Sequence, residues 1–212
     1  MNTARTPGIL HIDSLRVGYP DAPPVVDGWS ATLGPGVTLL HGDTGSGKST
    51  LLRAWAGVHP AAGRLTLAGT ALDRDPEGYQ RHVFFVDPST DTFDEVTARA
   101  CTDALTQADA GFDAPRWNAL VEGFSLAPHL DKKMHMLSTG SKRKVWLAAA
   151  LSANRALTLL DEPTGGLDAG SMRCLWRALK DIAATGERAV VVASGEHVDA
   201  VPLAATIALP LR

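Results

Sequence analysis

The chain has 212 residues, of which 45% are hydrophobic and 20% charged, so it is long enough for a substantial core and has an ordinary globular composition. Its formal net charge of −3 provides no overall positive field, and nucleic acid is not expected as a partner. Residues 1–8 lack a signal-peptide pattern, and the longest apolar run, 145–151, is far shorter than the ~20 residues that cross a bilayer. We therefore expect a cytosolic chain. Cys101 and Cys174 stand alone in the sequence, without the spacing of metal ligands, and are expected to be small apolar packing residues.

The first predicted elements are strands of an exposed lobe. Residues 9–19 alternate apolar and polar side chains, and residues 63–69 repeat this pattern between two glycines. Such alternation is typical of strands with one face in water. The two segments predict an antiparallel β lobe.

Between these strands lies a glycine-rich loop that fits a polyphosphate. A short apolar strand, 37–40, leads into it and a helix, 48–55, is expected to leave it. Glycines allow backbone N–H groups to turn toward phosphate oxygens, Lys48 neutralises phosphate charge, and Ser49 offers a hydroxyl to Mg²⁺. The helix also directs its positive end at the anion. The predicted nucleotide-binding residues are Gly42, Asp43, Thr44, Gly45, Ser46, Gly47, Lys48, Ser49 and Thr50.

Further along the chain, apolar strands alternate with helical segments. Residues 83–86, 157–160 and 189–193 resemble 37–40 in being almost wholly apolar, as in strands covered by helices on both faces. Between positions 94 and 136 the periodicity is helical and predicts an inserted helical unit. One predicted apolar face of its first helix carries Val96, Ala100, Ala104 and Leu105.

Two carboxylates end one of the buried strands. Asp161 and Glu162 follow 157–160, at the sheet edge where α/β proteins bind ligands. Asp161 is the predicted metal ligand, directly or through water, and Glu162 is the predicted base that polarises the attacking water. The preceding segment, 137–144, opens a helix that Ser138 or Ser141 can cap. With Gly140, Ser138 also forms a second potential anion site for which this chain has no evident need.

The order of these motifs resembles that of the ATP-binding cassette (ABC) ATPases over nearly the whole chain. Leu137 to Gly140 is similar to the family's signature motif, and 165–168 is similar to its loop at the dimer interface. The resemblance implies an α/β fold of the P-loop NTPase class and ABC type, with a mixed core sheet, an antiparallel β lobe and an inserted helical subdomain. It implies a single domain, 1–212, in which core and lobe occupy about 1–86 and 145–212 and the helical subdomain about 87–144.

The resemblance also assigns roles to individual residues. Tyr19 is the aromatic residue that stacks on adenine, and Asp161 and Glu162 are the metal-binding and catalytic acids. Ser138, Thr139 and Gly140 contact the nucleotide of a partner subunit, and Asp168 lies in the interface loop. The implied cofactors are ATP and Mg²⁺.

The implied function is that of an ATP-binding and ATP-hydrolysing subunit that energises a separate membrane permease through ATP-dependent dimerisation. The second ABC subunit is either identical or different. The permease would hold the chain peripherally on the inner face of the cell membrane.

Two positions depart from the family pattern near the γ-phosphate. Asp87 stands where the family has glutamine, and it either ligates Mg²⁺ or caps the turn before Pro88. Gly195 stands where the family has a histidine, so either His197 reaches the site as the switch residue or that contact is missing. Loss of one such contact costs on the order of 10²–10³ in rate. The alternative function is therefore a hydrolysis-impaired subunit that acts as a nucleotide-dependent clamp or regulator.

Overall fold

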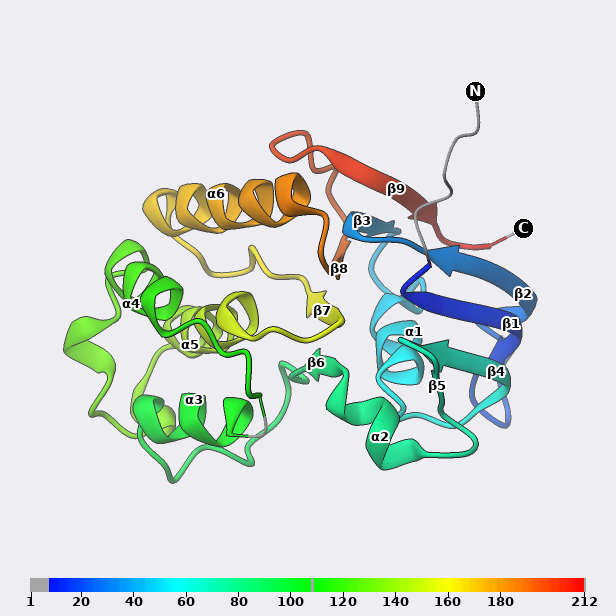
Figure 1. Ribbon diagram of the computed structural model, residues 1–212, viewed down its shortest axis with the longest axis horizontal. Coiled ribbons are helices and arrows are strands. Elements are labelled where there is room, and N and C mark those ends of the chain that lie inside the picture. Colours follow the sequence, from blue (N-terminus) through cyan, green and yellow to red (C-terminus); the bar gives the residue numbers. More distant parts are fainter. Residues whose placement is uncertain (1–7, 108, 212) are drawn as a thin grey trace.

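The protein contains two β-sheets that lie side by side, as a computed structural model describing residues 8–107 and 109–211 shows (Figure 1). The strands are β1 (Leu10–Val17), β2 (Val26–Leu33), β3 (Gly36–His41), β4 (Ala61–Leu67), β5 (Thr70–Ala71), β6 (Val83–Phe85), β7 (Leu157–Asp161), β8 (Ala189–Ser194) and β9 (Leu203–Ala208). One sheet is antiparallel with the order β2-β1-β4-β5, and the other is parallel with the order β6-β7-β8-β3-β9. The predicted α/β fold is confirmed, and its mixed strand directions come from two separate sheets.

Helices cover both faces of the parallel sheet. They are α1 (Lys48–Trp55), α2 (Pro76–Arg81), α3 (Ala98–Thr106), α4 (Ala114–Gly123), α5 (Thr139–Ser152) and α6 (Ala169–Thr185), with 3₁₀ turns η1 (Ala127–His129) and η2 (Met134–Met136). Figure 1 shows α3, α4 and α5 gathered at one end of the molecule and the antiparallel sheet at the other. The predicted limits of a helical subdomain, about 87–144, stay a prediction. No helix among the described residues is long and apolar enough to cross a membrane.

Alternate residues of the parallel strands face two different cores. Along β8, Val190 and Val192 pack with α3, α4, α5 and α6, whereas Val191 and Ala193 pack with α1 and the antiparallel sheet. A strand that is buried on both faces has no reason to carry polar side chains. This explains why these strands are almost wholly apolar in the sequence, with Thr38 and Thr158 as the buried exceptions in β3 and β7.

The predicted apolar face of the first inserted helix is wrong in part: Leu105 packs against the core, but Val96 is exposed and precedes the helix. In α3 the buried residues include Cys101, Thr102 and Thr106, whereas Ala100 and Ala104 are exposed. The threonine hydroxyls donate to carbonyls one turn earlier in the same helix, Thr102 to Ala98 at 3.1 Å and Thr106 to Thr102 at 2.9 Å. Because each hydroxyl is satisfied within the helix, these residues can face the core.

A buried arginine closes the end of α5. Arg188 is 7% exposed, and its guanidinium donates to the carbonyls of Ala150, Leu151 and Ala153. Helix ends leave carbonyls without intrahelical partners, and a cation interacts favourably with them. Burial lowers the pKa of Arg188. Its position just before β8 ties the end of α5 to the central sheet.

We expect Arg188→Met to lower the free energy of unfolding by about 2 kcal/mol, because the methionine keeps the apolar stem but leaves buried carbonyls without a charged donor. Urea unfolding followed by circular dichroism would measure the change. Arg173→Met, at an exposed position of α6, is the matched control. An unchanged midpoint for Arg188→Met would contradict this role.

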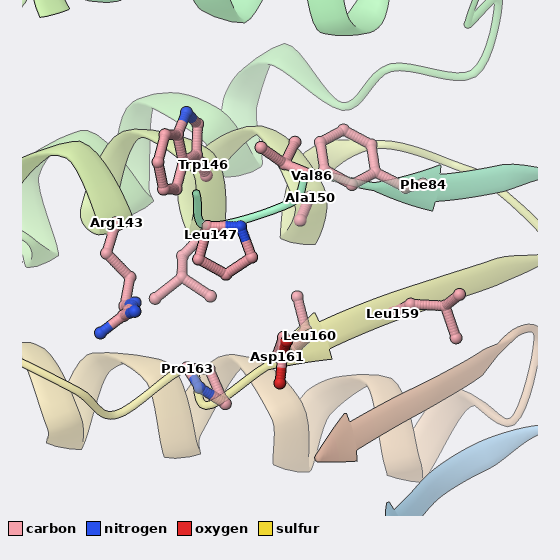
Figure 2. A pocket seen from close by; sticks show the side chains of 11 residues that line it. Phe84, Val86, Arg143, Trp146, Leu147, Ala150, Leu159, Leu160, Asp161 and Pro163 are labelled. Carbon is pink, nitrogen blue, oxygen red and sulfur yellow. The ribbon is translucent and has the colours of Figure 1, made fainter. Parts of the chain in front are cut away.

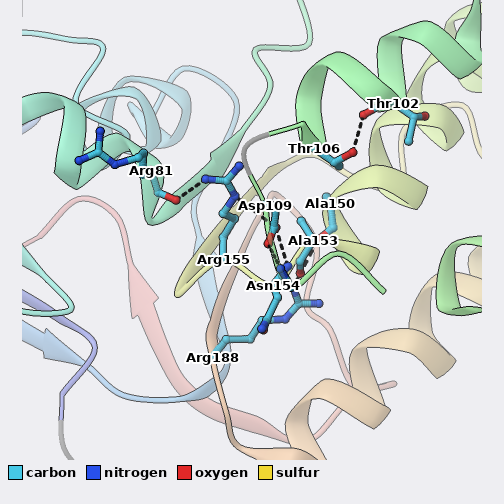
Figure 3. A network of polar contacts seen from close by, with 10 residues as sticks. Arg81, Thr102, Thr106, Asp109, Ala150, Ala153, Asn154, Arg155 and Arg188 are labelled. Atoms are coloured by element: carbon cyan, nitrogen blue, oxygen red, sulfur yellow. Dashed lines mark hydrogen bonds and ion pairs between the residues drawn. The ribbon is translucent and has the colours of Figure 1, made fainter. Parts of the chain in front are cut away.

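A second polar cluster joins the inserted helices to the central sheet (Figure 3). Asp109, between α3 and α4, accepts the N–H of Asn154 at 2.8 Å and lies 3.2 Å from the guanidinium Nε of Arg155. The two side chains are 5% and 10% exposed, respectively. Arg155 also donates to the carbonyl of Arg81 at the end of α2. Through the ion pair with Asp109 and the hydrogen bond to Arg81, Arg155 therefore connects three segments that are distant in sequence.

Candidate functional site

The glycine-rich loop lies between β3 and α1, as predicted. Gly45 and Gly47 adopt left-handed φ angles of 81° and 98°. At Gly47 a Cβ atom would lie 2.4 Å from a side-chain carbon of Val25, so a larger residue would require both strain and displacement. No side chain caps the start of α1, which leaves its first N–H groups for an anion.

Lys48 lies at the centre of the loop with its ammonium group turned inward. The residue is 6% exposed, and Nζ donates to the carbonyl oxygens of Gly42 at 2.6 Å and Asp43 at 3.1 Å. Nζ also lies 3.2 Å from Oε1 of Glu162. A buried ammonium that faces one carboxylate and two carbonyls is suited to a more highly charged anion, such as a polyphosphate.

Asp161 presents a carboxylate oxygen that has no hydrogen-bond partner among the residues that the structure describes. Its Oδ1 is buried without a hydrogen bond, and burial raises the pKa of Asp161, an effect that the nearby Ser49 side chain opposes. Figure 2 shows Asp161 beside a small apolar cavity of about 30 Å³ between β6, β7 and α5. A carboxylate oxygen with a serine hydroxyl beside it, set against apolar groups, fits a hard cation such as Mg²⁺. Within the described ranges, no three His, Cys, Asp or Glu side chains gather to hold a metal ion by themselves.

The loop and the end of β7 share one open cleft of about 560 Å³. Its lining consists of Thr44, Gly45, Gly47, Lys48, Ser49, Thr50, Glu162, Thr164, Gly165, Gly195 and Glu196. The structure thus brings the predicted base and six of the nine predicted loop residues to one cavity. The lining does not include Gly42, Asp43, Ser46 or the predicted metal ligand Asp161.

Tyr19 lies in a neighbouring cleft of about 690 Å³. Its side chain is half exposed, its hydroxyl is 3.4 Å from Oγ1 of Thr50, and its ring makes an edge contact with that of His59 at a centroid distance of 5.2 Å. An accessible aromatic face that is linked to the phosphate loop could support a nucleotide base. The role of Tyr19 remains a prediction.

The segment from Ser138 to Gly140 is presented at the surface at the start of α5. Ser138 caps the helix by accepting the N–H of Ser141 at 3.2 Å, and both Ser138 and Thr139 are exposed. Gly140 packs directly on the loop that follows β7, where a Cβ atom on Gly140 would come within 2.3 Å of the carbonyl oxygen of Gly166. This start of α5 is thus open to solvent and packed against a second loop.

A hydrogen bond and an ion pair hold α5 to the same loop. Arg143 donates to the carbonyl of Gly165, and Lys144 lies 2.6 Å from Asp168. The hydrogen bond from Lys144, with further bonds from Ser171, lowers the pKa of Asp168, which caps α6. The start of α5 and the loop after Glu162 are therefore fastened together.

Comparison with known proteins decides the family. A family model described as "ABC transporter" matches residues 26–165. A cytochrome c biogenesis ATP-binding export protein, CcmA, of Rhodospirillum rubrum is 36% identical over 191 residues, covering 82% of this chain and 82% of the relative.

The chain belongs to the ABC transporter family.

Other similar proteins agree with this membership. The cobalt import ATP-binding protein CbiO of Rhodobacter capsulatus is 32% identical over 190 residues, covering 84% of this chain and 67% of that protein. A solved ATP-binding subunit of an ABC transporter is 24% identical with a TM-score of 0.75, covers 87% of this chain and 79% of its own, and supports the fold. The chain is therefore an ABC transporter ATP-binding subunit, of the ATPase class.

The first departure from the ABC pattern has a charge partner that the sequence analysis did not foresee. The carboxylate of Asp87 accepts a hydrogen bond from Nε of Arg53 at 2.6 Å and further bonds from the N–H and hydroxyl of Ser89. Arg53 belongs to the last turn of α1. The added negative charge is thus neutralised within the chain, and the side chain also caps the turn that follows. Whether Asp87 ligates a metal stays a prediction.

We expect the stability contributed by this ion pair to disappear in acid. The hydrogen bond from Arg53 lowers the pKa of Asp87 to about 2, whereas an unfolded aspartate has a pKa of about 3.9. The pair therefore stabilises the fold fully above about pH 4 and loses its contribution as the pH falls toward 2.

Asp87→Asn should lower the free energy of unfolding at pH 7 by about 1–2 kcal/mol and should lose less stability than the wild type between pH 4 and 2. Thermal unfolding at several pH values would measure both effects. Asp91→Asn, at an exposed carboxylate, is the control. Parallel curves for the wild type and Asp87→Asn would contradict the assignment.

The second departure concerns His197, which lies outside the cleft lining in this ABC subunit. Its ring stacks on that of His41 at a centroid distance of 4.3 Å and an interplanar angle of 26°. Gly195 and Glu196 line the cleft instead. The role of His197 as switch residue stays a prediction. Its stacking on His41, outside the cleft lining, argues against that role.

Sequence reasoning missed several residues that lie in or near the cleft. Arg53 stands five positions after Lys48 on the same helix, a spacing that could have suggested a second cation near the loop. Thr164, Gly165 and Glu196 line the cleft through loop geometry, for which the sequence carries no comparable signal.

Proposed function

We propose that the chain binds MgATP and hydrolyses it, and that two cassettes close around the nucleotide to drive a separate membrane permease. The observation that carries the proposal is the approach of Lys48 Nζ to Glu162 Oε1, 3.2 Å apart in one cleft. In this proposal the ammonium group neutralises a terminal phosphate and the carboxylate acts as the base for the attacking water.

In this proposal each residue has a separate task. The backbone of the loop and Lys48 hold the phosphates, and Asp161 with Ser49 would hold Mg²⁺, which supplies charge neutralisation and orientation of the phosphates. Glu162 accepts a proton from the attacking water. Tyr19 packs against the adenine base of the nucleotide.

The exposed start of α5 supports the pairing of cassettes. Ser138 and Thr139 are solvent-exposed in the single chain, and the helix beginning there has N–H groups to offer an anion. A second copy or a different ABC subunit would bring its own bound phosphate to them. The permease would then hold the pair on the inner face of the membrane.

A clamp or regulator with little hydrolysis is the second candidate. The position of His197 against His41 favours it, because no histidine among the described residues lines the cleft. The pairing of Lys48 and Glu162 argues for the active enzyme.

The test is nucleotide binding and phosphate release by the purified chain, alone and with the membrane protein that co-purifies after gentle extraction. Saturable MgATP binding with phosphate release that Lys48→Ala removes would support the proposal. Binding without release would support the clamp. Failure to bind MgATP in either preparation would overturn both.

A further inference from the structure

The end of β8 holds Glu162 at two points. The backbone N–H of Glu162 donates to the carbonyl of Ala193 at 3.0 Å, and the N–H of Gly195 donates to Glu162 Oε1 at 3.1 Å. Glu162 has a φ of 43°, in the left-handed region that residues with a Cβ atom seldom occupy. Such a conformation persists only where surrounding contacts impose it. Backbone and carboxylate are therefore both fixed by one neighbouring strand end.

The third contact of Glu162, with Lys48, is the one that a nucleotide would replace. Within the described part of the chain, the charged partner of Lys48 is the Glu162 carboxylate, at 3.2 Å. A triphosphate in the loop carries several negative charges and would compete for the ammonium group. The N–H of Gly195, by contrast, is already satisfied by the carboxylate. After nucleotide binding, Gly195 is the group that remains to orient Glu162.

We propose that the backbone N–H of Gly195 is the positioning group for the Glu162 carboxylate, so that the general base of this subunit is oriented by a main-chain donor in place of an ionisable side chain. The inference rests on the proposed ATPase function. It assigns a role to the glycine at which the chain departs from its family, and it assigns none to His197.

The direct test compares Gly195→Ala with Gly195→Pro. Among the described residues, the one atom within 4 Å of a Cβ atom at Gly195 would be the carbonyl oxygen of Gly42, at 3.7 Å, so alanine fits and keeps the N–H. Proline removes the donor. We expect Gly195→Pro to lower kcat on the order of 10²-fold with KM little changed, and Gly195→Ala to keep most of kcat. Equal kcat values for the two variants would overturn the proposal.

His197→Ala tests the rival arrangement. We expect its kcat and the pH dependence of kcat to match those of the wild type, because His197 stacks on His41 outside the cleft lining. A loss of kcat similar to that of Gly195→Pro would show that His197 orients the base and would overturn the proposal.

A measurement without ATP separates this inference from the proposed function. Amide hydrogen exchange at Gly195, followed by NMR in the nucleotide-free chain, should become about tenfold faster in Glu162→Ala, which removes the acceptor. Unchanged exchange would overturn the contact whatever the ATPase assay shows, and it also decides the matter if Gly195→Pro fails to fold. If exchange is faster in Glu162→Ala but the wild-type chain releases no phosphate, the contact exists and the ATPase proposal is overturned. The contact would then have no catalytic role.

Discussion

Glu162→Gln is expected to lower the rate of ATP hydrolysis by about 10²–10⁴-fold while leaving nucleotide binding intact. Glutamine keeps the size of the side chain and an oxygen that can accept the Gly195 N–H, but it cannot take a proton from water. Lys48, which also donates to two loop carbonyls, remains free to hold phosphate. Steady-state phosphate release and equilibrium binding of labelled ATP would separate the two effects.

The same variant should accumulate as a nucleotide-bound pair of cassettes, because hydrolysis no longer opens it. Light scattering after gel filtration with MgATP, in the presence of the membrane partner, would measure this. Glu122→Gln, an exposed carboxylate on α4, is the control and should behave as the wild type. If Glu162→Gln kept its turnover, or formed no ATP-dependent pair, Glu162 would not be the base of the proposed reaction.

Asp109→Ala is expected to lower the free energy of unfolding by about 3–5 kcal/mol, because it leaves the Arg155 guanidinium buried without its carboxylate. It also removes the acceptor of the Asn154 N–H. Urea unfolding at pH 7 would measure the loss. For a domain of ordinary stability, this is a large share of the total free energy of unfolding.

Two further variants make this result specific. Asp103→Ala, at an exposed position of α3, should change the unfolding midpoint little. Asp109→Asn keeps an acceptor for Asn154 but loses the charge, so its effect should fall between those of the other two. A midpoint for Asp109→Ala equal to that of Asp103→Ala would show that the ion pair carries no net stability.

The sequence sufficed for those parts of the site that local spacing determines. The loop that ends at Lys48 is a continuous stretch whose glycines and lysine must occur at fixed separations, and α1 begins at Lys48 as predicted. The buried strands β3, β7 and β8 were predicted because a strand covered on both faces needs an apolar run. In each case the physical requirement acts on neighbours in the chain.

The remaining features depend on residues that meet only in the folded protein. Arg53 and Asp87 are 34 positions apart, and Arg188 reaches carbonyls 35 to 38 positions away. No local pattern marks either arginine as a partner. The orientation of α3 was mispredicted because its buried threonines satisfy their hydroxyls within the helix, so their polarity did not reveal their position.

The contact between Gly140 and Gly166 has a consequence for the timing of the proposed reaction. Because the two backbones touch, and Arg143 and Lys144 fasten the same segments, a displacement of the segment after Glu162 must be shared by the start of α5. In a pair of cassettes each chain would therefore convey the departure of its own phosphate to the nucleotide held opposite.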